Sequence, residues 1–426
     1  MKKILLLVML SLSQVAMSQD IISMPSKQYL MSGVENKIFV QTFTRKHFLD
    51  GDIVRFEGDA SYAKGGVREK YAMLKEPKDG QKIEVKLYDG EEYSVKETKS
   101  SEIRVGDPTQ GKGVVRVQFL GDSFTKGCYF RDAFIDKGYV PNVKLIGTRR
   151  VPDAEGYFHE GRGGWSMYKY YSNNPRSSTF HNPYYQPEGD LNYWGGVDFW
   201  KTAYMLNKEG GAGKSLDVRY NCGDYDTSRF GEDGYLVNPS KNDMMYDRSK
   251  DSYVVWTGKK WSKIEEPKEW DFDYSKYLKM WGFESPEYLV VMLGLNDFRD
   301  DLSLPIDFTE WNALVERMFV SYKKAVPNGR LLLSTPCTSC GVLDNESGAF
   351  TLRKNTMMWH VRENIIKEFD GREAEGLIVV DASATIDNEN GYNTKGDMQV
   401  GNSHPYPNYP ALGVPLAACV QYFREK

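Results

Sequence analysis

The chain has 426 residues, of which 27% are charged and 13% aromatic, and its formal net charge is −4. This mild and dispersed negative charge offers no basic surface for nucleic acid, so we expect no nucleic-acid partner. A chain of this length is expected to form two domains, or one large domain with a smaller companion.

The first residues predict a signal peptide over residues 1–18. The opening MKKILLLVMLSLSQVAMSQD places two lysines before an apolar run that is too short to span a bilayer comfortably, and Ala16, Met17 and Ser18 then form a cleavage site. The first cysteine is Cys128, so a lipid anchor is not expected, and no later apolar run is long enough for a membrane helix. We therefore expect an exported protein, periplasmic or secreted, without membrane insertion.

Residues 19–107 predict a small all-β domain. Runs such as NKIFVQTF, QKIEVKLYDG and EYSVKET alternate apolar and polar side chains and are separated by turn residues. We expect about seven strands, arranged as a sandwich. The stretch GDPTQGKG, residues 106–113, marks the boundary, because neither a strand nor a helix favours its Gly, Pro and polar residues.

Residues 114–426 predict an α/β domain. Amphipathic stretches at 124–137, 309–325, 352–369 and 412–423 predict helices, and five apolar runs predict buried strands: GVVRVQFLG, NVKLIGT, EYLVVMLG, GRLLLST and GLIVVDAS. This alternation is typical of a parallel sheet covered by helices on both faces. An aromatic-rich insertion at about 156–271 interrupts it, and within the insertion DSYVVWTGKKWSKI predicts a hairpin.

The end of the first strand of this domain carries a candidate nucleophile. The stretch VQFLGDSFTKG delivers Asp122 and Ser123 to the carboxyl end of the strand, in a turn bounded by Gly121 and Gly127. Ligands of parallel α/β sheets bind beyond these strand ends, and a tight turn exposes the serine hydroxyl. The alternative is that Ser123 only caps the helix that follows.

Three further stretches fall at strand-to-helix junctions of the same sheet: HEGRGGWS, GLNDFRDD and GNSHPYPNYP. With the first stretch, they resemble the four blocks of the SGNH hydrolases, or GDSL-type esterases. The block residues here are Ser123, Gly164, Asn296 and His404, and the match covers roughly three quarters of the predicted mature chain. The resemblance implies a three-layer αβα, flavodoxin-like domain with a five-stranded parallel sheet.

The resemblance also implies an acyl-transfer mechanism. Ser123 would attack an ester carbonyl after His404 removes its proton. The backbone N–H groups of Ser123 and Gly164 and the side-chain amide of Asn296 would then stabilise the oxyanion, with Gly163 as an alternative to Gly164. The GDSFT stretch lacks the GxSxG spacing, which disfavours the α/β-hydrolase fold.

One position departs from the family pattern. SGNH hydrolases usually place an aspartate three residues before the histidine, and here that residue is Gly401. The histidine needs a partner that fixes its tautomer, and this partner need not be a carboxylate. Three alternatives are open: Asp397 on a different loop path, Asn402, or a backbone carbonyl that completes a Ser-His dyad.

The N-terminal β domain resembles those that precede SGNH domains in exported bacterial esterases acting on polysaccharides. The resemblance implies an acylated glycan as the substrate and the removal of O-acetyl groups from it. Trp165 and Asp297 are candidate substrate-binding residues. The aromatic residues of the insertion either line a sugar cleft or fill a core: Trp165, Tyr184, Tyr185, Trp194 and Trp200. The alternatives are a lipase or lysophospholipase on the same scaffold, and a glycan-binding protein with a decayed site.

The other reactive side chains favour structural roles. Cys337 and Cys340, in TPCTSCG, form either a disulfide or two free thiols, since no further zinc ligands occur at a suitable spacing. Four histidines lack a motif position and are expected to be structural or adjacent to substrate: His47, His159, His181 and His360. We expect no metal and no cofactor, because the sequence has neither a P-loop nor a GxGxxG after a strand. The sequence does not indicate an oligomeric state.

Overall fold

A computed structural model describes most of the chain outside its N-terminus and the insertion. The described residues are 20–44, 53–58, 71–172, 182–187, 235, 237–239, 241, 244–247, 252–263, 269–298, 304–337, 352–387, 391–392, 394–395, 398–399, 404–405 and 408–424. Several predictions lie outside them: the signal peptide over 1–18, His47, His181, Trp194, Trp200, Cys340, Asp397, Gly401 and Asn402.

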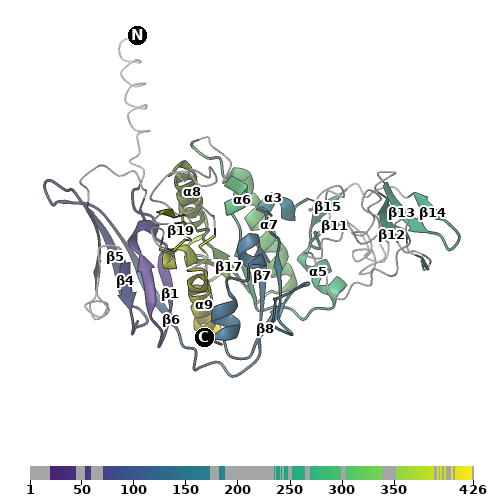
Figure 1. Cartoon of the computed structure of the whole chain (residues 1–426), viewed down its shortest axis with the longest axis horizontal. Coiled ribbons are helices and arrows are strands. Elements are labelled where there is room, and N and C mark those ends of the chain that lie inside the picture. The colour runs from purple at the N-terminus through teal and green to yellow at the C-terminus, as the bar shows by residue number, and fades with distance from the viewer. Residues whose placement is uncertain are drawn as a thin grey trace, which may run out of the picture.

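A mainly parallel sheet forms the centre of the molecule (Figure 1). The five apolar runs form β7 (Val115–Gly121), β8 (Val143–Ile146), β16 (Tyr288–Met292), β17 (Arg330–Ser334) and β18 (Leu377–Val380), in the order β18-β17-β16-β7-β8 and with parallel pairing throughout. β16, β17 and β18 are buried on both faces almost throughout, as continuous apolar runs require.

This sheet has seven strands in the described part of the chain, not the five that were expected. β10 (Phe158–Gly161) pairs in parallel with the carboxyl end of β7, beyond the residues that pair with β8. β9 (Arg149–Arg150) then pairs antiparallel with β10. Both additional strands are too short for an alternation pattern to show in the sequence.

Helices cover both faces of the sheet. α7 (Thr309–Ala325) and α8 (Leu352–Phe369) lie together, joined by amide hydrogen bonds between Asn312 and Asn364, and α5 (Tyr274–Trp281) packs against α7. α9 (Gly413–Arg424) lies on the other side, against a π-helical turn at Asp132–Asp136.

The single helix predicted over 124–137 is wrong. The structure has a four-residue α2 (Ser123–Lys126), a turn, and then the π-helical turn. The break follows from Cys128, whose φ of 55° is left-handed and cannot continue a right-handed helix.

The N-terminal region packs on the α/β domain through α9. β1 (Lys27–Met31), β6 (Val95–Gly106), β5 (Lys82–Tyr88) and β3 (Ile53–Gly58) form a four-stranded sheet in that order, and β2 (Asn36–Phe39) pairs with β4 (Tyr71–Leu74). A Cβ on Gly106 would lie 2.4 Å from the Ala418 carbonyl oxygen, so β6 touches the backbone of α9. Figure 1 shows α9 between this sheet and the parallel sheet.

The described residues therefore do not form the predicted sandwich of seven strands. They contain six strands in this region, in one sheet and one two-stranded ribbon. The reason is that α9 covers one face of the four-stranded sheet, where a sandwich would place a second sheet.

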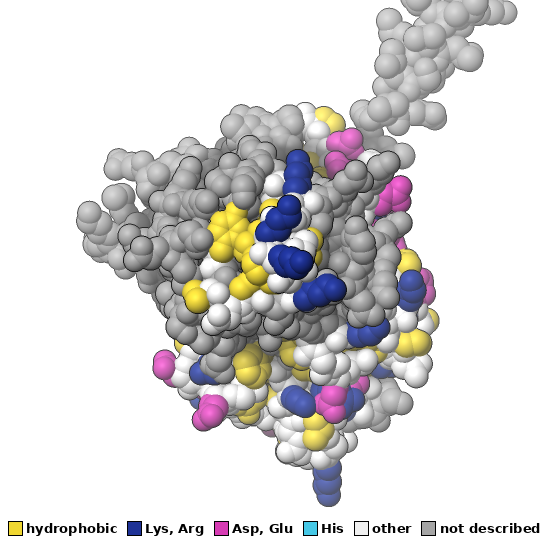
Figure 2. Space-filling view, turned by 90° about the vertical axis from the view of Figure 1, so that its right-hand side faces the viewer, with side chains coloured by type: hydrophobic (Ala, Val, Ile, Leu, Met, Phe, Trp, Pro, Cys, Tyr) yellow, Lys and Arg dark blue, Asp and Glu magenta, His cyan; other side chains and the backbone are white. Residues whose placement is uncertain are grey.

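The predicted insertion begins too early, because β10 belongs to the central sheet; after it, the described parts are a short helix, α3 (Met167–Tyr170), and small β elements. β11 (Tyr185–Pro187) pairs with β15 (Trp270–Phe272), and β12 (Met244–Asp247), β13 (Ser252–Trp256) and β14 (Trp261–Lys263) form a three-stranded sheet. β13 and β14 confirm the predicted hairpin. Figure 2 shows basic side chains gathered beside hydrophobic ones at this end of the molecule, where the described exposed lysines include Lys241, Lys259, Lys260 and Lys263.

Tyr184, beside β11, is one of the aromatic residues predicted either to line a sugar cleft or to fill a core. Its ring is fully buried and stacks on Phe272 at 5.0 Å and on Tyr277 at 4.2 Å. It fills a core and does not line a cleft. Within the described residues, no helix has the length and apolar character needed to cross a membrane.

A buried ion pair ties the first described residues to the sheet. The Arg362 guanidinium binds the Asp381 carboxylate and donates to the Ser23 carbonyl oxygen at 2.7 Å, and neither charged side chain is exposed. Asp381 follows β18 and also accepts from Thr335, at the end of β17, at 2.8 Å. Although burial opposes its ionisation, Arg362 and hydroxyl donors hold the pKa of Asp381 below its usual range.

We expect Asp381→Ala to destabilise the protein strongly. The substitution leaves the Arg362 charge buried without its partner, and breaking a buried pair in this way costs about 3–5 kcal/mol. Urea denaturation followed by circular dichroism measures the loss. Lys144→Gln is the control, because its ion pair with Glu284 at 2.8 Å is more than half exposed on both sides, and its unfolding midpoint should equal that of the wild type. Equal midpoints for Asp381→Ala and the wild type would contradict this account.

Candidate active site

Ser123 stands at the carboxyl end of β7 as the first residue of α2. Gly121 is required just before it, because a Cβ there would lie 2.5 Å from the Met292 carbonyl oxygen of the neighbouring strand. Asp122 is buried and caps α2, since its carboxylate accepts from the backbone N–H of Phe124 at 2.9 Å. The alternative that Ser123 serves as the cap is therefore wrong, and its hydroxyl is not used for this purpose.

The loop after β10 lies directly against α2. A Cβ on Gly161 would fall 2.2 Å from the backbone nitrogen of Lys126, and the Arg162 N–H donates to the Gly121 carbonyl oxygen at 2.8 Å. Gly164 follows at the exposed end of this loop with a φ of 75°. The second block of the motif is thus held beside the turn that carries Ser123.

Asn296 links the first three blocks. It lies in α6 (Leu295–Phe298), which begins just after β16, and its side-chain nitrogen donates to the Asp122 carboxylate at 3.2 Å and to the Trp165 carbonyl oxygen at 3.0 Å. The amide therefore binds groups on two other elements, at the ends of β7 and of the loop after β10. To donate to an oxyanion, it would share or exchange one of these two hydrogen bonds.

Asp297 and Trp165 do not lie as substrate-binding residues would. The Asp297 carboxylate accepts from the Met167 N–H at 2.7 Å and from the Gly294 N–H at 3.1 Å, so it holds two loops together. Removal from water raises its pKa to about 7, although these donors favour ionisation. The Trp165 ring is 0% exposed and packs on Tyr170, so it offers no face to a sugar. Of the two alternatives for Trp165, a sugar cleft or a core, its burial favours the core.

His404 lies beside the nucleophile turn. Its ring stacks on Phe124, the residue after Ser123, with centroids 5.0 Å apart and planes 18° apart. Its Nδ1 is hydrogen-bonded to the hydroxyl of Tyr129. Burial lowers the pKa of His404 to about 4, so the imidazole is neutral at ordinary pH and is able to accept a proton.

Sequence reasoning missed Tyr129. This residue follows α2 in the turn that ends at Phe130, and it is only 3% exposed. It is one of 28 tyrosines and lies 275 positions from His404, so nothing in the sequence distinguished it. Asp397 and Asn402, the partners predicted for His404, lie outside the described residues.

Other reactive side chains near the site are structural. His159 is buried, and its Nδ1 accepts from the Gly161 N–H at 2.9 Å; burial lowers its pKa to about 3. His360 contacts Glu363 at 3.2 Å. Cys337 carries a free, buried thiol, which favours the second of the two alternatives for the CxxC stretch. No three His, Cys, Asp or Glu side chains cluster as metal ligands within the described part of the chain.

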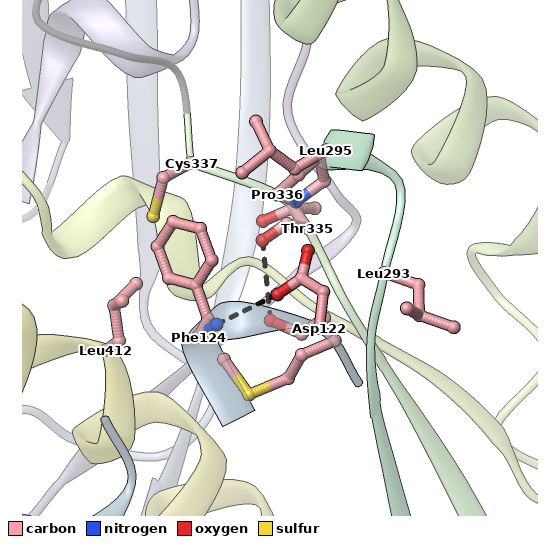
Figure 3. A pocket seen from close by; sticks show the side chains of 10 residues that line it. Asp122, Phe124, Leu293, Leu295, Thr335, Pro336, Cys337 and Leu412 are labelled. Atoms are coloured by element: carbon pink, nitrogen blue, oxygen red, sulfur yellow. Dashed lines mark hydrogen bonds between the residues drawn. The ribbon is translucent and has the colours of Figure 1, made fainter. Parts of the chain in front are cut away.

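A small apolar cavity lies beside the nucleophile turn (Figure 3). Its volume is about 20 Å³. Asp122 and Phe124, the residues on either side of Ser123, line it together with Leu295, Pro336, Cys337 and Leu412. It has room for one group of about the size of a water molecule or a methyl group.

Comparisons with known proteins give distant likenesses. No protein-family model matches the chain, and no curated protein matches it. A carbohydrate esterase family 3 structure from Talaromyces cellulolyticus is 12% identical, with a TM-score of 0.35, over 73% of this chain and 99% of that one. An acetyl esterase mutant solved with an acetate ion is 12% identical, with a TM-score of 0.36 and the same two coverages.

A third likeness extends over more of the chain. A carbohydrate esterase family 2 enzyme plus carbohydrate-binding domain from Corynascus thermopiles (Myceliophthora fergusii) is 13% identical, with a TM-score of 0.30, over 92% of this chain and 91% of that one. TM-scores of this size carry no argument about fold or function.

We expect Gly161→Ala to destabilise the contact between β10 and α2, and with it the turn that carries Ser123. The added methyl group would meet the backbone of α2 at 2.2 Å, and no side chain there is able to move aside. The free energy of unfolding should fall by about 3 kcal/mol or more, as in severe overpacking. Gly163→Ala is the control, because its methyl group would meet only the flexible Lys126 side chain, at 3.2 Å. Thermal unfolding of the two variants compares them, and equal losses would show that close approach at Gly161 is not the constraint.

Proposed function

We propose that the protein is an exported serine ester hydrolase that removes O-acetyl groups from a glycan. One observation carries the proposal: Phe124, next to Ser123, stacks on the ring of His404, so the nucleophile and its base belong to one small site. The hydrogen bonds of Asn296 to Asp122 and Trp165 support it, because they draw three of the four motif blocks together.

The mechanism follows from ordinary acyl transfer. His404 accepts the Ser123 hydroxyl proton at Nε2 while the serine oxygen bonds to the ester carbonyl carbon. The sugar oxygen then leaves and takes this proton from the imidazolium. Water repeats the sequence on the acetyl-enzyme, which releases acetate and restores the serine. N–H donors from Ser123, Gly164 and Asn296 stabilise the oxyanion at both stages, and loss of one such donor typically costs about 10²–10³ in kcat.

The small cavity supports an acetyl group as the acyl part. Its space of about 20 Å³ is lined mainly by apolar side chains, among them Phe124, the residue after Ser123, and suits a methyl group. A lipase or lysophospholipase would need an apolar groove for a long chain. The size of this cavity therefore favours a short-chain esterase.

A larger groove supports a glycan as the alcohol part. It has a volume of about 330 Å³ and lies between the β2–β4 ribbon and the segment before α9. Tyr71 lines it with Asp387 and Asn408, side chains that suit sugar rings and hydroxyls. One short 3₁₀ helix, η8 (Tyr409–Leu412), separates it from the site: Ala411 lines the groove, whereas Leu412 lines the small cavity. We assign the groove to sugar units that flank the acetylated one.

Acetate release tests the proposed function. The substrates are acetylated xylan, acetylated mannan and O-acetylated sialic-acid glycans, and the proteins are the mature wild type and Ser123→Ala. We expect release from one of these glycans, and a loss of at least about 10³-fold in the variant, as removal of a catalytic serine typically causes.

The other outcomes separate the alternatives. Cleavage of nitrophenyl acetate through Ser123 without acetate from any glycan would keep the chemistry and reject the glycan. Efficient cleavage of long-chain nitrophenyl esters would favour the lipase. Inactivity in every assay, together with no labelling by a fluorophosphonate probe, would favour the decayed binding protein.

We expect Tyr71→Ala to impair cleavage of the polymer alone. Loss of one sugar-stacking ring should raise the KM for the acetylated glycan by about threefold to tenfold. The kcat/KM for nitrophenyl acetate should stay within about twofold of the wild type, because this ester does not reach the groove. Tyr93→Ala is the matched control, since Tyr93 is 63% exposed in the turn between β5 and β6 and does not line the groove. An unchanged KM for the polymer would show that the groove does not bind the glycan.

A further inference from the structure

The partner of His404 is the open question of this site. The family pattern would place an aspartate at Gly401, and the structure instead brings the Tyr129 hydroxyl to Nδ1. Tyr129 comes from the turn after α2, which is the helix that Ser123 begins. The nucleophile and the side chain that contacts its base therefore belong to one short segment.

The position of Tyr129 is fixed by its packing. Its backbone N–H donates to the Phe124 carbonyl oxygen at 3.2 Å. Its ring meets Phe124 edge-on at 5.1 Å and stacks on Tyr409 at 4.8 Å. Because Phe124 also stacks on the imidazole, the rings of Phe124 and Tyr129 together hold His404 beside the turn that carries Ser123.

The proposed role of His404 as a base determines which group donates in its hydrogen bond with Tyr129. A base that takes the serine proton at Nε2 must carry its own proton on Nδ1. The Nδ1–H group then donates to the tyrosine oxygen, which accepts as any hydroxyl does. The opposite arrangement would leave the proton on Nε2, where it would block the reaction.

We propose that Tyr129 is the positioning residue of His404, and that its hydroxyl oxygen accepts the Nδ1–H hydrogen bond that a carboxylate accepts in a Ser-His-Asp triad. The proposal rests on the proposed esterase function. Tyr129 selects the productive tautomer and fixes the plane of the ring, and it does not contact the substrate.

A neutral partner has a measurable consequence. A carboxylate raises the pKa of a neighbouring imidazole, whereas a hydroxyl does not carry the charge to do so. Burial lowers the pKa of His404 to about 4, and the side chains that face its ring from α2 and the following turn, Phe124 and Tyr129, are uncharged at this pH. Protonation abolishes the base, so kcat/KM of the wild type should fall only as the pH drops through about 4, well below the usual value near 6.5.

The test is Tyr129→Phe, which keeps the ring and removes the acceptor. Without it, the ring exchanges between tautomers, and we expect kcat for nitrophenyl acetate to fall by about tenfold to a hundredfold with KM unchanged. Long-range ¹H–¹⁵N NMR of the imidazole should show Nδ1–H in the wild type and a mixture in the variant. Tyr409→Phe is the matched control, because it removes a hydroxyl from the ring that stacks on Tyr129 and should leave kcat and tautomer unchanged.

Asp397→Asn and Asn402→Ala complete the comparison. The proposal is overturned if either of them lowers kcat and shifts the tautomer while Tyr129→Phe does neither. It is also overturned if wild-type His404 carries its proton on Nε2, a result that does not depend on the folding of any variant. Full activity of Ser123→Ala and His404→Gln would instead reject the proposed function. The NMR measurement of the His404 tautomer does not depend on that activity, so it would still confirm or overturn the role of Tyr129.

Discussion

The carboxylate of Asp122 is the interaction on which the geometry of the site depends. It is buried at the end of β7, where a polar group is stable only if hydrogen-bond partners surround it. One donor is the N–H of Phe124, which starts α2, and another is the amide of Asn296, from the end of β16. Each donor arrives from a different element. The cost of leaving the carboxylate unsatisfied therefore fixes the position of the nucleophile turn relative to its neighbours.

A second constraint is the close contact between α9 and the N-terminal sheet. Gly106 approaches the backbone of Ala418 so closely that no side chain fits between them, and the Arg362–Asp381 pair adds a charged link from the first described residues to the sheet. The N-terminal region is thus built onto the α/β domain along one face. In our proposal this contact is also functional, because the β2–β4 ribbon forms one wall of the groove assigned to the glycan.

The sequence predicted the features that depend on neighbouring residues. The five apolar strands of the parallel sheet and the β13–β14 hairpin follow from apolar runs and turn residues, and the stretches that carry Ser123, Gly164 and Asn296 follow β7, β10 and β16. The predictions that were wrong concern features set by distant contacts or by a single backbone angle. The left-handed Cys128 breaks a helix that periodicity alone would extend, and α9 takes the place of a second β-sheet. The burial of Trp165 and the contact of Tyr129 with His404 were equally out of reach of the sequence, because the surroundings of an aromatic residue are set by what the fold brings against it.

If the neutral Tyr129 hydroxyl is the partner of His404, the other residues of the site must contribute more to the rate of the proposed reaction. A carboxylate partner stabilises the imidazolium that forms as the serine attacks, and Tyr129 offers no such charge. A base with a pKa near 4 is also a weaker proton acceptor at neutral pH than one poised near 7. More of the rate must then come from charge stabilisation at the other end of the reacting bond, by donors already fixed in place. In our proposal Asn296 is one of these donors: its hydrogen bonds to Asp122 and to the Trp165 carbonyl oxygen hold the amide in place, and it shares or exchanges one of them to bind the oxyanion.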